Sequence, residues 1–292
     1  MTQSRRAAAA TLLSASLAGC LGSISPLAPG LRGSVGLPNQ GVLTDGVELP
    51  EAGVGYVRYR RQSDHYFGVP RLVAAIEKAA ADVARGAPGE VPLFVGDLSA
   101  RTGGKIPNHA SHRTGRDVDL LYFVTNVYGK PTNSPGFVSV GSDGLAQIPA
   151  TGRFLHLDAD REWRLVRSLL MNSEIEVLWM FVSRDVEALL IMQARALGES
   201  NELVWRAEQV LHQPRDSSPH DDHMHLRIAC TQSESLDGCE GGGPHWPWFG
   251  DPNLSEQTEA NLWAMLRTEP SPSEALATHD NVNASDGSSS SR

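Results

Sequence analysis

Cysteine is scarce in this chain, whose 292 residues include three cysteines, at positions 20, 230 and 239. The thiols are therefore too few for the closed, cysteine-containing sites that usually hold structural zinc. If Cys20 lies outside the folded protein, an even pair remains, and the short polar segment TQSESLDG separates its two members. Such a pair predicts one local disulfide, Cys230–Cys239, in an oxidising compartment. Two buried, reduced thiols are the alternative.

Positive charge is also in short supply, because 25 basic residues face 34 acidic ones and the formal net charge is −9. Binding to nucleic acid needs a basic face that neutralises phosphates, and adsorption to anionic lipid needs positive charge too. The charge therefore argues against a nucleic-acid partner and against direct adsorption to a membrane surface. The apolar content of 40% is ordinary for a soluble globular protein.

Several common catalytic motifs are missing from the sequence. The serine-nucleophile motifs S-x-x-K and G-x-S-x-G do not occur. The helical zinc-protease motif H-E-x-x-H is also absent, and no glycine-rich phosphate loop follows a predicted strand. These absences argue against serine acyl-enzyme chemistry and nucleotide chemistry.

The N-terminal apolar stretch, residues 7–18, follows Arg5 and Arg6 and is too short to span a bilayer. It ends in Leu-Ala-Gly-Cys (17–20), which resembles a bacterial lipobox, where the signal is removed ahead of a cysteine that is then lipidated. We expect residues 1–19 to be a lipoprotein signal peptide. A lipid on Cys20 would then anchor the protein in the periplasm or cell envelope, as its only attachment to the membrane. An ordinary cleavage site with an incidental cysteine is the alternative.

Composition divides the remaining chain into three parts. Residues 20–50 are rich in Gly, Pro and Ser without a periodic pattern, which predicts a tether. Residues 266–292 are polar and of low complexity, which predicts a disordered tail. The folded domain is therefore expected over residues 51–265, which is long enough for one sizeable core.

Within this domain, helical and strand periodicities alternate without a regular βαβ rhythm. Apolar residues at helical spacing predict helices over 71–84, 161–171, 184–198 after an N-cap at Ser183, and 202–212. Apolar or alternating runs predict strands over 91–95, 118–124, 175–182 and 223–230. Together these elements predict an α+β fold with a central antiparallel sheet flanked by helices.

Five of the ten histidines fall into two tight groups. The first is His109 and His112, followed by Asp119, and the second is His220, His223 and His225. In a strand, residues two apart point to the same side, so His223 and His225 should project together while the methionine between them faces the core.

The first group can reach the second. Asp119 lies at the start of an apolar strand, and the glycines and proline around His112 allow a turn that folds its side chain back over Asp119. Two imidazoles and a carboxylate can then converge from two strands, with another histidine beside them. That set is typical of catalytic zinc, because three protein ligands leave a fourth position for a water whose pKa falls to about 7. The sequence thus predicts a zinc site on the sheet. A histidine-rich surface strand with a capping aspartate is the alternative.

At this point the chain resembles a known family. GGKIPNHASHRTGRDVDL (103–120) and HDDHMHLRIAC (220–230) are similar to the penicillin-insensitive murein endopeptidases, zinc peptidases related to D-Ala-D-Ala peptidases and lysostaphin-type enzymes. YFGVPRLV (66–73), GDLS (96–99) and FVS (181–183) also match that family's pattern. Some members hold a second metal downstream of the first motif, but residues 141–160 offer no match to that site.

The resemblance implies a role for each histidine. His112, Asp119 and His225 are expected to bind one zinc ion per chain. His223 is then the catalytic base or stabilises the transition state. His109 and His220 match further active-site histidines of the family, and in some members the residue that matches His109 is a metal ligand.

The resemblance also implies the activity. The chain is expected to be a zinc endopeptidase that hydrolyses peptide cross-links of peptidoglycan, with the stem peptides as its partners. Insensitivity to β-lactams would follow because no acyl-enzyme forms. A zinc D,D-carboxypeptidase or dipeptidase acting on uncross-linked stems is one alternative, and a non-catalytic murein-binding lipoprotein is another.

Overall fold

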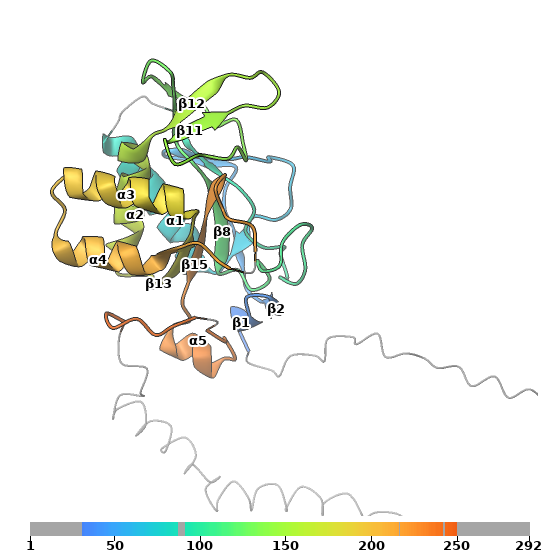
Figure 1. Cartoon of the computed structure of the whole chain (residues 1–292). Helices are drawn as coiled ribbons and strands as arrows, with labels where there is room; N and C mark the ends of the chain where they lie inside the picture. Colours follow the sequence, from blue (N-terminus) through green and yellow to red (C-terminus); the bar gives the residue numbers. More distant parts are fainter. Residues whose placement is uncertain (1–30, 87–90, 216, 242, 250–292) are drawn as a thin grey trace, which may run out of the picture.

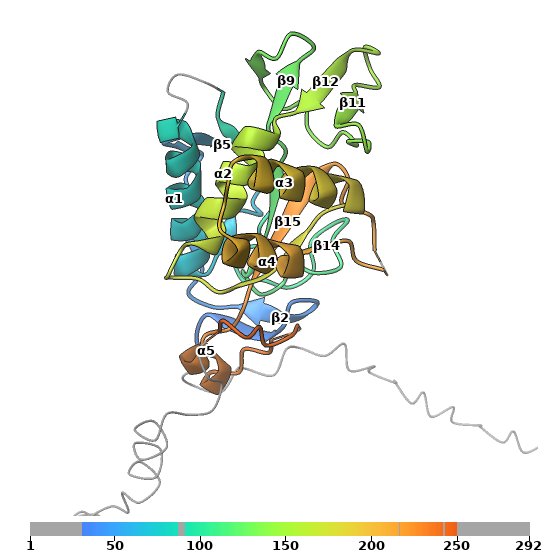
Figure 2. The same cartoon turned by 60° about the vertical axis from the view of Figure 1, so that its left-hand side comes forward.

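The computed structural model describes residues 31–86, 91–215, 217–241 and 243–249 (Figure 1). Four helices pack on one face of a seven-stranded sheet, and loops and smaller sheets surround the other face (Figures 1 and 2). No helix in the described ranges is long and apolar enough to cross a membrane. The predicted signal peptide, Cys20, the start of the tether and the tail all lie outside the described residues.

The large sheet is mixed, with the strand order β14-β13-β15-β8-β7-β5-β4. Its centre is antiparallel as predicted, but β14 runs parallel to β13 and β5 runs parallel to β7. The prediction of an antiparallel sheet is wrong at these two pairs because helices connect the strands and return the chain in the same direction. The strands are β4 (Ala52–Gly53), β5 (Tyr56–Arg58), β7 (Leu93–Val95), β8 (Asp117–Leu121), β13 (Val177–Phe181), β14 (Leu211–His212) and β15 (His223–Ile228).

All four predicted helices are present and cover one face of the sheet (Figure 2). They are α1 (Pro70–Gly86), α2 (Ala159–Leu170), α3 (Arg184–Ala196) and α4 (Asn201–Val210). Ser183 caps α3 as predicted, since its side chain accepts a hydrogen bond from the Val186 N–H. Beneath the helices lie the alternate strand residues Val118, Leu120, Met224 and Leu226, all buried in the core. The opposite alternation of β8 and β15 therefore faces away from the helices.

The tether predicted for residues 20–50 is wrong over its second half. There β1 (Ser34–Leu37) and β2 (Gln40–Leu43) form an antiparallel hairpin, and β3 (Val47–Glu48) pairs with β6 (Phe67–Gly68). Leu43 and Leu49 belong to the buried core. Pro38, which suggested a linker, lies in the two-residue turn between β1 and β2, and Gly36 has a left-handed φ of 80° within β1. The folded domain therefore begins before residue 51.

A second, antiparallel sheet of four short strands follows β8, in the order β10-β9-β12-β11 (Figure 1). Its strands are β9 (Val124–Asn126), β10 (Pro131–Thr132), β11 (Leu145–Gln147) and β12 (Phe154–Leu157). The strand predicted over 118–124 is therefore divided between β8 and β9. The loop between β10 and β11 brings Phe137 back to the large sheet. There its ring packs against that of His223, with the two ring centroids 5.1 Å apart.

After β15 the chain forms a small closed loop. The predicted disulfide Cys230–Cys239 is present, and it encloses the short helix α5 (Gln232–Leu236). Arg71 of α1 donates to both carboxylate oxygens of Glu234, at 2.9 and 2.5 Å. Buried Arg116 donates to the carbonyl of Glu240 at 2.6 Å. The loop is thus fixed to the domain at several points.

One buried carboxylate of α2 makes the free energy of unfolding depend on pH. Glu162 is fully buried; Oε2 accepts from the Phe123 N–H at 3.1 Å, and Oε1 has no partner. Burial raises its pKa from 4.5 to about 8. Between these values the unfolded chain ionises while the folded chain keeps the proton. The free energy of unfolding should therefore fall by about 1.4 kcal/mol per pH unit in that interval.

Glu162→Gln removes this titration. We expect the variant to gain stability over the unmodified chain as pH rises from 4.5 to 8, and to differ little in slope below pH 4.5. Urea unfolding of both proteins across pH 4–9 measures the difference, in which all other titrating groups cancel. Parallel stability profiles would show that Glu162 ionises without penalty.

Candidate active site

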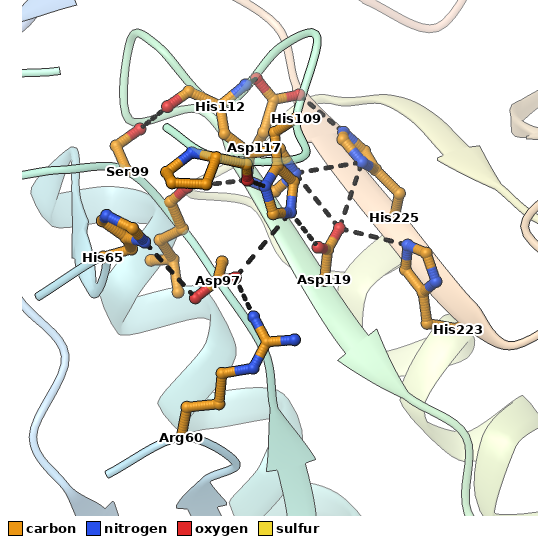
Figure 3. Close-up of polar contacts among 12 residues, drawn as sticks. Arg60, His65, Asp97, Ser99, His109, His112, Asp117, Asp119, His223 and His225 are labelled. Carbon is orange, nitrogen blue, oxygen red and sulfur yellow. Dashed lines mark hydrogen bonds and ion pairs between the residues drawn. The ribbon is translucent and has the colours of Figure 1, made fainter. Parts of the chain in front are cut away.

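The register of β8 and β15 places the predicted residues opposite one another. Asp119 pairs with His225 and Asp117 pairs with Arg227 on the adjacent antiparallel strand. Residues directly opposite in such a pair project from the same face, and residues two apart share that face. His223 therefore joins them, and the group faces away from the helices (Figure 3).

His112 reaches this face from the turn before β8. Its φ is 64°, a left-handed conformation that is uncommon outside glycine, and its side chain is buried. The ring Nδ1 lies 2.7 Å from the carbonyl oxygen of Leu98. A proton on Nδ1 is needed for that hydrogen bond, so the lone pair of Nε2 points at Asp119, whose Oδ1 is 3.2 Å away.

Asp119 is the centre of the cluster. Its side chain is 2% exposed, and no hydrogen-bond donor is assigned to Oδ1. Around that oxygen lie three ring nitrogens, His112 Nε2 and His225 Nδ1 at 3.2 Å and His223 Nε2 at 3.4 Å. Burial alone would raise the pKa of Asp119, but the neighbouring histidines hold it well below its usual range. The carboxylate is thus ionised in a nearly dry setting.

His109 contacts the other oxygen of the same carboxylate. Its Nε2 lies 3.1 Å from Asp119 Oδ2, and its Nδ1 lies 2.7 Å from the carbonyl oxygen of Pro107. Burial would lower the pKa of His109, but the hydrogen bond and charge of Asp119 outweigh it and raise the pKa.

His223 and His220 differ in charge. Burial would lower the pKa of His223, but Asp119 and Asp222 outweigh it and raise the pKa to about 10; Asp222 Oδ1 is 2.6 Å from Nδ1. For His220, burial and then the neighbouring His225 and His223 lower the pKa to about 4. His220 is therefore a neutral imidazole at neutral pH, and its buried Nδ1 has no hydrogen-bond partner. A neutral ring that lines the cleft can form hydrogen bonds with a substrate.

The sequence analysis missed Asp117. This carboxylate is fully buried and accepts from His225 Nε2 at 2.9 Å and from Arg227 Nε at 2.6 Å. Burial would raise its pKa, but Arg227 and His225 lower it. Because His225 donates from Nε2, its Nδ1 lone pair is directed at the cluster. The sequence pattern that could have predicted Asp117 is the alternation in DVD (117–119), which puts both carboxylates on one face of the strand.

The roles of Asp97 and Arg60 were also missed, because Asp97 was matched only as part of GDLS (96–99) and Arg60 lies outside the matched segments. Asp97 is buried just after β7, and its Oδ2 accepts from Arg60 Nη1 at 2.8 Å. The same oxygen lies 3.9 Å from His109 Nε2, so this ion pair borders the cluster (Figure 3).

All six predicted side chains meet in one cleft of about 720 Å³. Two groups of possible metal ligands lie there: His109, His112 and Asp119, and His220, His223 and His225. The alternative of a solvent-exposed histidine-rich strand is wrong, because His112, Asp119 and His225 are each at most 5% exposed. The arrangement can hold a metal ion beside an open cleft.

Comparison with known proteins identifies the family. The family model described as penicillin-insensitive murein endopeptidase matches residues 34–245. The chain belongs to this family. A penicillin-insensitive murein endopeptidase of Haemophilus influenzae is 24% identical over 241 residues, which cover 78% of this chain and 77% of the relative. Those of Klebsiella pneumoniae and Escherichia coli are 28% and 27% identical, over 74% and 77% of this chain and 73% and 79% of their own.

The match to this murein endopeptidase family begins at residue 34, the first residue of β1. The family's region therefore includes the hairpin that the sequence analysis assigned to a tether. Leu37, Pro38 and Asn39 of this hairpin line the cleft. The hairpin is thus part of the family's functional domain.

The metal content of single variants should distinguish the ligands from the other side chains of the cluster. We expect His112→Ala, Asp119→Ala and His225→Ala each to reduce bound divalent metal from about one ion per chain to nearly none, because each removes one of the three expected ligands. His223→Ala should keep its metal, and His245→Ala, which changes an exposed histidine, is the control. Elemental analysis of the purified, dialysed proteins measures this. Full occupancy in two of the three variants would refute the ligand assignment.

Proposed function

We propose that this murein endopeptidase hydrolyses peptide cross-links of peptidoglycan with one zinc ion held by His112, Asp119 and His225. The observation that carries the zinc assignment is the spacing of three atoms. His112 Nε2, Asp119 Oδ1 and His225 Nδ1 lie 3.2, 3.2 and 3.3 Å from one another. Ligands at about 2.0–2.1 Å in a tetrahedral zinc site are separated by about 3.3 Å.

The donor types support zinc over other common ions. Two imidazoles and one carboxylate suit zinc, whereas magnesium and calcium prefer oxygen ligands throughout. Oδ1 of Asp119 is buried and accepts no hydrogen bond, which is what we expect of an oxygen atom that binds a cation. His109 lies on the other oxygen of this carboxylate, so we place it beside the ion rather than among the three ligands.

When bound, zinc would polarise the scissile carbonyl and lower the pKa of a water molecule to about 7. The chain's own residues would then move protons. His223 Nε2 faces the cleft while Nδ1 is held by Asp222, so Nε2 is the atom that would exchange a proton with the substrate. Because a cation would offset the charge of Asp119, it would remove a main cause of the raised pKa of His223.

His220 would act as a neutral hydrogen-bonding group. Its carbonyl oxygen accepts from Tyr122 Oη and from the Ser183 N–H, each at 2.9 Å, which fixes its left-handed backbone. Its neutral ring lines the cleft and would donate an N–H to the developing oxyanion. None of the serines that line the cleft, Ser111, Ser217 and Ser218, has a side-chain hydrogen bond to a histidine among the described residues. No serine nucleophile is therefore activated, and β-lactams, which acylate serine, should not inhibit.

The activity can be tested with purified cross-linked muropeptides. Mass analysis should show that the metal-loaded protein converts dimers to monomers, that a chelator abolishes this, and that added zinc restores it. His223→Ala should keep the metal but lose at least about 10²-fold in turnover, the scale of a lost general acid–base group. Release of terminal D-Ala from uncross-linked stems, without dimer cleavage, would instead indicate a carboxypeptidase.

We also propose that a lipid on Cys20 anchors the protein in the cell envelope. The support is the sequence alone, in which a positive start and a short apolar stretch precede Leu-Ala-Gly-Cys.

Replacement of the anchoring cysteine gives a direct test. Cys20→Ser should move the full-length protein from the membrane fraction to the soluble fraction, while activity on soluble muropeptides is unchanged. Immunoblots of fractionated cells measure the distribution. Sedimentation with membranes in both forms would exclude lipidation at this residue.

A further inference from the structure

A row of aromatic rings leads away from the cleft along the large sheet. On β13, Phe181 lies opposite His225 of β15, so its side chain projects from the face that carries the site. Trp179, two residues earlier on the strand, shares that face, while Met180 between them is buried in the core. Phe181 lines the cleft, and its ring centroid lies 5.8 Å from that of Trp179. The row therefore begins inside the cleft.

The segment after the disulfide-closed loop extends this row. The Trp246 ring lies 5.2 Å from that of Trp179, and its Nε1 donates to the carbonyl of Leu178 at 2.9 Å. Trp248 stacks on Trp246, with the ring centroids 5.3 Å apart and the planes within 6°. The ring of Trp205, from α4, lies 5.1 Å from that of Trp248. The aromatic row thus consists of Phe181, Trp179, Trp246, Trp248 and Trp205.

Solvent reaches the aromatic row, and polar groups border it. Trp205 is 42% exposed and the other four side chains are partly exposed, whereas Trp163 is fully buried in the core. Contiguous exposed rings of this size mark binding sites more often than ordinary surface. The ring of His212 lies 5.1 Å from that of Trp179, and the guanidinium of Arg206 lies 5.8 Å from the Trp248 ring. The surface suits a ligand that has both apolar faces and hydroxyl groups.

A sugar ring is such a ligand. Its C–H groups point to the two faces of the ring and carry a small positive charge, which is attracted to the negative face of an aromatic ring. Its hydroxyl and acetamido groups lie around the rim, where His212 and Arg206 have N–H groups to donate. A purely apolar ligand would not use these donors.

The aromatic row also lies at a suitable distance from the cluster. The stem peptides of murein are covalently joined to a glycan strand, so a stem bound in the cleft brings sugars to a neighbouring surface. Three or four extended residues span about 10–14 Å. Because successive rings are 5.1–5.8 Å apart, about two or three steps from Phe181 cover that length. The sugars would then lie over the tryptophans beyond the cleft.

We propose that the aromatic row binds the glycan strand of murein while the attached stem peptide occupies the cleft. This inference rests on the proposed hydrolysis of murein cross-links and adds the sugars to what the enzyme recognises. Cross-linked peptides that carry sugars should be better substrates than the same peptides without sugars. The difference should depend on the tryptophans.

Two cross-linked dimers test the proposal, one with a disaccharide on each stem and one freed of its sugars by an amidase. With the metal-loaded wild-type chain, kcat/KM should be about 3- to 10-fold higher for the sugar-bearing dimer, the scale of one or two aromatic stacking contacts. Trp205→Ala and Trp248→Ala should each bring this ratio closer to one. Trp205→Phe keeps a ring and should preserve most of the ratio.

Tyr128→Ala is the matched control. Tyr128 is 91% exposed in the turn between β9 and β10 and does not line the cleft, so this variant loses an exposed ring outside the aromatic row. Its ratio should equal that of the wild-type chain. Metal content and thermal unfolding of every variant check the fold.

A binding measurement tests the aromatic row without catalysis. Peptide-free glycan strands of murein, titrated into the wild-type chain, should change its tryptophan fluorescence in a saturable way. Trp205→Ala should weaken the apparent affinity by about 3- to 10-fold. Size-exclusion chromatography of both proteins tests whether a second copy of the chain covers the row instead.

Equal kcat/KM for the two dimers, or glycan strands that leave the fluorescence unchanged, would refute the glycan site and leave the proposed function intact. An equal loss on both dimers in Trp205→Ala, with metal retained, would assign the aromatic row to the stem peptide. A wild-type dimer that Trp205→Ala converts to monomers would assign it to a second copy. A wild-type chain that cleaves neither substrate refutes the proposed function, and the glycan titration then decides this inference by itself.

Discussion

A carboxylate buried among imidazoles is the interaction on which the rest of this structure depends. Asp119 is almost completely enclosed, and an ionised carboxylate in that setting is costly unless cations or donors surround it. The fold supplies ring nitrogens from β15 and from the loop before β8 at 3.1–3.4 Å. The proposed cation would offset this charge and take up the lone pairs that His112 and His225 direct at the centre. The strand register and the left-handed turn at His112 both serve this geometry.

Four imidazoles of the cluster share one hydrogen-bonding arrangement. Each uses one nitrogen to contact a fixed oxygen and presents the other to the centre. For His112 and His109 the fixed oxygens are the backbone carbonyls of Leu98 and Pro107, and for His223 and His225 they are the carboxylates of Asp222 and Asp117. These contacts choose the tautomer and the ring orientation before any ligand arrives. His220 departs from this arrangement, since its buried Nδ1 has no hydrogen-bond partner.

The sequence predicted the elements whose residues repeat with a clear period. The four helices and the strands β7, β13 and β15 were recognisable because apolar residues mark their buried faces. Parallel pairing of β14 and β5 was not, because their direction depends on how helices return the chain, which no local pattern records. The cluster histidines and Asp119 were predicted from spacing and resemblance, whereas Asp97 and Arg60 come from separate segments and meet only in the folded chain. The β1–β2 hairpin resembled a linker in the sequence because turns and linkers are both rich in glycine and proline.

That hairpin also determines how the domain would bear a load. Gly36 donates to the carbonyl of Gly238 at 2.7 Å and accepts from the Glu240 N–H at 3.2 Å, so the first strand is clipped to the disulfide-closed loop. Two residues later, Pro38 accepts from the N–H of Arg113, the neighbour of His112. A pull on the chain ahead of residue 31 would strain the clip at Gly36 before any tension reached the turn that holds His112. These hydrogen bonds at Gly36 would therefore bear a force applied at the N-terminal end before it reached the turn, so the position of His112 would not change.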